Sequence, residues 1–167
     1  DDELKQLRAI RALASRQPVE LVATYLGAHA LPPEFDGRAD AFIDAMSAAE
    51  LLRRISTERL ARFADVFCDR GAFDVTQSRR YLERCVAVGL RAKIHADELA
   101  QIGASRLAGE LRAVSADHLE HIDDEGIAAL RRAGSVAVVL PGTSFYLGIP
   151  HAPARRLMEA GLPLAIA

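Results

Sequence analysis

Residues 90–118, LRAKIHADELAQIGASRLAGELRAVSADH, decide the fold class of this chain. Residues 90–95 and 113–118 are short, largely apolar runs, and each predicts a buried strand. Between them, residues 102–111 place apolar side chains at helical spacing and predict a helix. A strand, a helix and a second strand in this order form the unit from which parallel α/β sheets are built.

The same alternation extends in both directions along the chain. Asp74 and Gln77 stand at capping-box spacing at the start of a helix that Gly89 ends. Gly134 and Gly161 also fall between a helix and a strand, where a left-handed residue lets the chain turn back. The remaining pattern predicts helices at 4–13, 39–62, 74–88, 123–133 and 152–160, and strands at 19–28, 63–68, 136–140 and 162–167.

These elements predict an α/β fold with six parallel strands. An open doubly wound sheet has the same order, but no G-x-G-x-x-G motif follows any strand, so dinucleotide binding has no support. An incomplete TIM-type (β/α)8 barrel that lacks two strands fits better. No domain boundary interrupts residues 1–167, so we expect one partial barrel domain.

Composition narrows the possible partners. The net charge of −2 arises from 21 basic and 23 acidic residues spread along the sequence, so no nucleic-acid surface is predicted. No signal peptide and no apolar run of bilayer length occurs, which predicts no membrane partner. Cys68 and Cys85 lack metal-ligand spacing, and we expect reduced thiols in a cytoplasmic protein.

Two histidines end neighbouring strands, where an α/β barrel carries its chemistry. His95 ends one strand, and Glu98 follows three residues later; an imidazole there can bind a metal, and the carboxylate can move a proton. His118 ends the next strand beside Asp117 and is expected to neighbour His95. The alternative for His95 is a capped strand end with a solvated acidic loop, and the alternative for His118 is a histidine whose hydrogen bonds are satisfied by a helix N-terminus or a backbone carbonyl.

Other polar residues receive weaker interpretations. His29 ends the strand at 19–28 and is a plausible substrate contact, whereas His121 and His151 are expected on the surface. Lys93 lies two residues before His95 and is expected on the same strand face, inside the barrel. A buried ammonium needs a partner of opposite charge, such as Asp65.

The segment after the fifth predicted strand, residues 140–148, combines a turn with hydroxyl and aromatic side chains. It is expected to be a loop that lines the substrate, although an ordinary βα connection has the same composition. Ser144 lies within this segment and has no Gly-x-Ser-x-Gly motif, which argues against a serine hydrolase.

Several segments together resemble the imidazolonepropionase family of cyclic amidohydrolases. They run in the family's order across nearly the whole chain, which is more specific than any single match. The segments are Thr24-Tyr25-Leu26-Gly27-Ala28-His29-Ala30 with Pro32-Pro33-Glu34, Val66-Phe67-Cys68-Asp69, Gln77-Ser78-Arg79-Arg80-Tyr81-Leu82, Lys93-Ile94-His95-Ala96-Asp97-Glu98, Ser115-Ala116-Asp117-His118, and Leu140-Pro141-Gly142-Thr143-Ser144-Phe145-Tyr146-Leu147-Gly148.

The resemblance implies hydrolysis of 4-imidazolone-5-propanoate to N-formimidoyl-L-glutamate in histidine degradation, with one zinc or iron ion as cofactor. His95 would match the metal ligand of the fifth barrel strand, and His118 would match the histidine that orients or deprotonates the attacking water. Glu98 would match the residue that contacts substrate and handles the proton. His29 would match a substrate-binding histidine. The full-length enzyme would be a cytoplasmic protein and a possible homodimer.

The resemblance also implies missing parts. The chain would correspond to about barrel strands 3 to 8, without the His-x-His pair of the first strand, the β-sandwich or the last metal-binding aspartate. The isolated chain is therefore expected to be inactive, with one of the family's metal ligands. Two alternatives stay open: a nucleobase-type deaminase, which also carries His-x-x-Glu after the fifth strand, and a metal-free α/β binding module.

Overall fold

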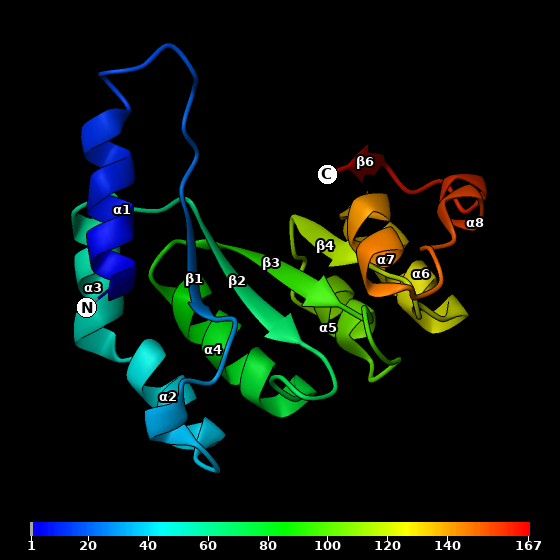
Figure 1. The fold of residues 1–167 in the computed structure, drawn as a ribbon, viewed down its shortest axis with the longest axis horizontal. Helices are drawn as coiled ribbons and strands as arrows, with labels where there is room; N and C mark the ends of the chain where they lie inside the picture. The colour runs from blue at the N-terminus through cyan, green and yellow to red at the C-terminus, as the bar shows by residue number, and fades with distance from the viewer. Residues whose placement is uncertain (1) are drawn as a thin grey trace.

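A six-stranded, wholly parallel sheet organises the chain (Figure 1). The computed structural model describes residues 2–167. Its strands lie side by side in sequence order, with β1 and β6 at the two edges. The strands are β1 (Thr24–Ala28), β2 (Phe63–Cys68), β3 (Arg91–Ala96), β4 (Ser115–His118), β5 (Val136–Val139) and β6 (Leu164–Ile166).

Helices connect successive strands, and the order of elements matches the alternation predicted from sequence. In Figure 1 the chain starts beside the β1 edge and ends at the β6 edge. The helices are α1 (Asp2–Leu13), α2 (Ala39–Met46), α3 (Ala49–Thr57), α4 (Val75–Ala87), α5 (Ala104–Glu110), α6 (Asp124–Ala133), α7 (Pro141–Leu147) and α8 (Ala154–Glu159), with a short 3-10 turn η1 (Pro33–Phe35).

The two faces of the sheet have different chemistry. The face that packs against the connecting helices consists of small and aliphatic side chains, all nearly inaccessible to solvent: Ala64, Val66, Ala92, Ile94, Ala116 and Ala137. The opposite face carries the alternating residues of the same strands, among them Asp65, Lys93 and His95. Because successive side chains of a strand point to opposite faces, one sequence supplies both an apolar core and a polar surface.

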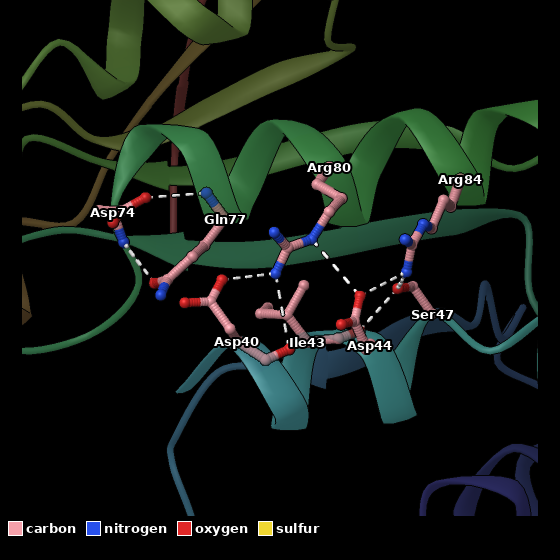
Figure 2. Close-up of polar contacts among 8 residues, drawn as sticks. All are labelled: Asp40, Ile43, Asp44, Ser47, Asp74, Gln77, Arg80 and Arg84. Carbon is pink, nitrogen blue, oxygen red and sulfur yellow. Dashed lines mark hydrogen bonds and ion pairs between the residues drawn. The ribbon is translucent and has the colours of Figure 1, made fainter. Parts of the chain in front are cut away.

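Helix α4 begins at the predicted capping box. The Asp74 carboxylate accepts the backbone N–H of Gln77, and the Gln77 side chain accepts the backbone N–H of Asp74 (Figure 2). Farther along, Arg80 pairs with Asp40 of α2 at 2.6 Å, and Arg84 pairs with Asp44 at 2.8 Å. These pairs join the exposed sides of α2 and α4.

Two boundaries predicted from sequence are wrong. The strand predicted at 19–28 begins only at Thr24: the Ala23 carbonyl still accepts the Arg62 N–H, but the earlier residues run outside the sheet and Val19 is 65% exposed. The helix predicted at 39–62 is two helices, because the Ser47 hydroxyl donates back to the Ile43 carbonyl and Ala48 is extended. Polar side chains that compete for backbone groups commonly interrupt a helix in this way.

The segment 140–148, predicted as a loop, is largely the helix α7. Pro141 occupies its first turn, where a missing N–H costs nothing, and Gly148 caps its end with a φ of 66°. Phe145 and Tyr146 are 83% and 87% exposed, so neither aromatic side chain lines a pocket among the described residues. Ser144 instead points inward and is buried.

Strand order and pairing fit part of a barrel. All five strand pairs are parallel and sequential, as in the wall of an α/β barrel, and β1 and β6 do not pair with each other. The sheet is therefore open within residues 2–167, which is compatible with the predicted partial barrel. No helix in the described chain is both long and apolar enough to cross a membrane.

Helices α5 and α6 cross at a point that only glycine allows. A Cβ built on Gly109 would lie 2.5–2.7 Å from Ala129 backbone and side-chain atoms. We expect Gly109→Ala to lower the free energy of unfolding by about 1–3 kcal/mol, because backbone atoms cannot move aside as a flexible side chain can. Urea denaturation of the intact protein measures this change in the free energy of unfolding.

Gly142 in α7 is the matched control, since a Cβ there meets nothing within 4 Å in the chain. Gly142→Ala should leave stability unchanged or raise it by up to about 1 kcal/mol through helix propensity. Equal destabilisation by both substitutions would contradict close packing as the cause.

Candidate functional site

The candidate site lies on the polar face of the sheet, at the carboxyl ends of β2, β3 and β4. The register places Lys93 opposite Asp65 and Ser115, and His95 opposite Phe67 and Asp117. These side chains share one face because paired residues of parallel strands point the same way. Parallel registration therefore brings together residues that are far apart in sequence.

His95 is held in a defined orientation by Asp65. Its Nδ1 lies 3.0 Å from Asp65 Oδ1, and its side chain remains 21% exposed. Burial lowers the pKa of His95, but the hydrogen bond and charge of Asp65 act against it, and the net pKa is raised. An Nδ1–H that donates to Asp65 leaves Nε2 with a free lone pair.

Lys93 compensates the buried carboxylates, as the sequence suggested for Asp65. Its ammonium lies 3.8 Å from Asp65 Oδ2 and 3.7 Å from Asp117 Oδ2. Burial raises the pKa of Asp117, and the charge of Lys93 opposes that rise. Asp65, His95 and Asp117 also offer ligand atoms within 4.8 Å of one another, but the Lys93 ammonium already serves both carboxylates.

His118 reaches the site through a backbone distortion. Strand alternation alone would turn it to the helix face, since its neighbour Asp117 faces the site. His118 and Leu119 instead adopt φ values of 80° and 72°, a left-handed conformation that non-glycine residues rarely take. The turn brings the His118 ring centroid to 5.3 Å from that of His95.

The environment of His118 keeps its ring neutral. Burial, followed by the proximity of His95, lowers the pKa of His118 to about 4. Its Nε2 lies 3.4 Å from Glu98 Oε2. A neutral imidazole can accept a proton at one nitrogen while its other nitrogen keeps an N–H.

Glu98 is buried beside His118 in the connection after β3. Burial, with a further contribution from the charge of Glu120, raises the pKa of Glu98. Asp69 fixes this connection, because its Oδ2 accepts the backbone N–H groups of Glu98 at 2.7 Å and Leu99 at 2.9 Å. Asp97, with a φ of 52°, turns the chain just before Glu98.

His29 follows β1 and joins the same group. Its ring centroid lies 5.1 Å from that of His95 and 5.4 Å from that of Phe67, on which it stacks. Burial, with the nearby His95, lowers the pKa of His29. A cavity of about 750 Å³ beside His29 also reaches Glu34 of the η1 turn.

The structure brings together every site residue predicted from sequence: His29, His95, Glu98 and His118. His151 is exposed as expected, whereas His121 is half-buried, and its backbone N–H donates to the Asp97 carbonyl. Asp69 and Glu120 also lie at the site but were not predicted as site residues from the sequence. Neither has a recognisable motif, since each acts through a contact with a residue that is remote or turned by the backbone.

The residues present fit a metal ion at His95. The Asp65 carboxylate contacts Nδ1 and fixes the ring, and the hydrogen bond of the His95 side chain within residues 2–167 is at Nδ1, not at Nε2. Histidines that bind metals commonly donate their other N–H to a carboxylate in this way. His95 therefore offers one ligand atom, and Glu98 and His118 lie nearby as groups that can accept or donate protons.

Solved structures with the same fold define the class. A guanine deaminase from C. acetobutylicum with bound guanine superposes with a TM-score of 0.70 at 11% identity, over 99% of this chain and 43% of that one. A zinc-bound adenosine deaminase from Xanthomonas campestris gives 0.60 at 17%, over 93% and 38%. At this identity the likeness shows the fold alone, and it supports the predicted part of a TIM-type α/β barrel.

Comparison of the sequence with known proteins is more specific than comparison of the fold. The chain is 53% identical over 167 residues to a protein of Symbiobacterium thermophilum named imidazolonepropionase. It is 49% identical over 168 residues to the protein of the same name in Bacillus velezensis. These matches cover 99–100% of this chain and confirm its resemblance to the imidazolonepropionases. The chain spans 39% of the length of both relatives. No protein-family model matches it.

Asp69 provides a test of how Glu98 is held. Asp69→Ala leaves the Glu98 and Leu99 N–H groups without their acceptor, and we expect it to reduce the free energy of unfolding by about 2–3 kcal/mol. Chemical denaturation gives the difference. Asp124→Ala is the control, because that side chain is 92% exposed and should change stability by about 0.5 kcal/mol or less. An equal loss in both variants would rule out the buried contacts.

Proposed function

We propose that the protein carrying this chain is an imidazolonepropionase. It hydrolyses the ring amide of 4-imidazolone-5-propanoate and releases N-formimidoyl-L-glutamate, a step of histidine degradation. The observation that carries the proposal is the cluster of His29, His95, Glu98 and His118, which come from separate segments and meet at one sheet edge. The relatives named imidazolonepropionase support it.

His95 would hold the metal through Nε2, with Asp65 fixing its ring from Nδ1. A zinc or iron ion there supplies a Lewis acid that polarises the scissile carbonyl and makes a nucleophile available from water at neutral pH. One histidine makes an incomplete set, since zinc sites use about three or four protein ligands. The other ligands in this proposal come from parts of the protein beyond these residues.

The remaining residues bind substrate and move protons. His118, neutral because of its lowered pKa, accepts the proton of the attacking water at Nε2. Glu98, whose pKa is raised, contacts the substrate and passes a proton to the departing ring nitrogen. His29 binds the substrate from its position beside His95. Two groups with oppositely shifted pKa values suit a pair that accepts and donates protons.

Further properties belong to the same proposal. Residues 1–167 form part of one barrel domain, to which additional strands are added. The protein works in the cytoplasm on a small-molecule substrate, as a possible homodimer, and does not bind nucleic acid. The deaminase-like structures do not favour deamination here, because likeness at 10–17% identity reflects the shared fold alone.

Two substitutions separate metal binding from proton transfer. We expect His95→Ala to lose both bound metal and turnover of the imidazolone substrate. Glu98→Gln should keep the metal but lower kcat by about 100-fold or more, because it can no longer donate a proton. Metal analysis and steady-state kinetics on the protein as encoded measure both effects.

His151→Ala is the control, since His151 is exposed and remote from the cluster in sequence. It should match wild type. Wild-type protein without activity on the imidazolone would refute the proposal, and ammonia release from guanine would replace it with a deaminase. Unchanged function in both site variants would point to a non-catalytic module.

A further inference from the structure

Glu120 is a buried carboxylate that the proposed reaction leaves without a role. Its side chain is 0% exposed, and its Oε1 accepts the Ser144 hydroxyl at 2.7 Å. Its other oxygen, Oε2, lies 3.9 Å from His118 Nδ1. The side chain thus stands between the first turns of α7 and the ring of His118.

Two buried atoms face each other across that 3.9 Å gap. His118 Nδ1 and Glu120 Oε2 are both inaccessible to solvent, and neither has a hydrogen-bond partner within the described chain. Buried polar atoms nearly always have hydrogen-bond partners. Here a ring nitrogen that can carry a proton lies next to a carboxylate oxygen that can accept a hydrogen bond, so one explanation can account for both. Catalytic hydrogen bonds are often long without substrate and shorten in the working complex.

The backbone on both sides of Glu120 is fixed. Leu119 donates its N–H to the Ala96 carbonyl at 3.0 Å, and His121 donates to the Asp97 carbonyl at 2.8 Å. Ser144 fixes the far end of the carboxylate and thereby directs Oε2 toward His118. Little freedom is left for Glu120 to turn elsewhere.

We infer that Glu120 is a positioning residue that holds His118 in its Nδ1–H tautomer, with Ser144 directing the carboxylate. Nδ1–H donates to Glu120 Oε2, so the lone pair resides on Nε2, the nitrogen that faces Glu98. A carboxylate that selects a histidine tautomer is the arrangement known from catalytic triads. This inference rests on the proposed function, in which His118 Nε2 accepts a proton.

The Ser144 contact makes Glu120→Gln a sharp test. The Ser144 hydroxyl donates and therefore retains the amide oxygen of the new side chain, which turns the amide NH2 toward His118 Nδ1. An NH2 there donates to Nδ1 and forces the Nε2–H tautomer. The base then carries its proton on the wrong nitrogen.

We expect Glu120→Gln to lower kcat by about 100-fold with KM changed by less than about threefold, as for a lost general base. Nitrogen NMR of the intact protein labelled with ¹⁵N-histidine should show the His118 proton on Nδ1 in wild type and on Nε2 in the variant. The double variant Ser144→Ala/Glu120→Gln frees the amide to flip and should recover part of the lost kcat and of the Nδ1–H signal.

Glu125→Gln is the control, because Glu125 is an exposed partner of Arg106 and should match wild type. The inference is overturned if wild-type His118 carries its proton on Nε2, a result that does not depend on any variant folding. It is also overturned if Glu120→Gln folds and keeps wild-type kcat and tautomer. Inactive wild-type protein would refute the proposed function alone, since the tautomer is measured without turnover.

Discussion

The site depends on one buried negative charge, that of Asp65. A carboxylate that is 2% exposed is costly unless partners compensate it, and here Lys93 and His95 both do so from the neighbouring strand. The pairing of β2 with β3 sets Asp65 opposite Lys93 and two residues from the level of His95. The same contact that makes the charge tolerable fixes the ring that is proposed to hold a metal.

Much of the fold could be predicted because its causes are local. The capping box at Asp74 and Gln77 depends on residues three apart, and the strand–helix alternation depends on short-range periodicity. The errors had both local and tertiary causes, since the Ser47 hydroxyl that interrupts the helix predicted at 39–62 contacts a residue only four positions away. Residues 19–22 have the apolar pattern of a strand but lie outside the sheet. Residues 141–147 contain a Pro and a Gly, a composition that fits a loop as well as the helix observed.

The candidate site was predictable where it follows strand ends, as with His95, Glu98 and His118. What the sequence could not supply is how His118 turns inward, since simple alternation places it opposite Asp117. Two left-handed residues resolve this, and backbone strain of this kind costs on the order of 1–3 kcal/mol and clusters at functional sites. Glu120 becomes a neighbour of the His118 ring only through that turn.

The sequential order of the six strands also bears on how the chain folds. Every strand pair in the described chain joins strands that are consecutive in sequence. Contacts between near segments close small loops and lose less chain entropy than remote ones. Such a sheet can grow one unit at a time from β1 toward β6 as a newly made chain emerges, with each added strand covering the edge left by the last.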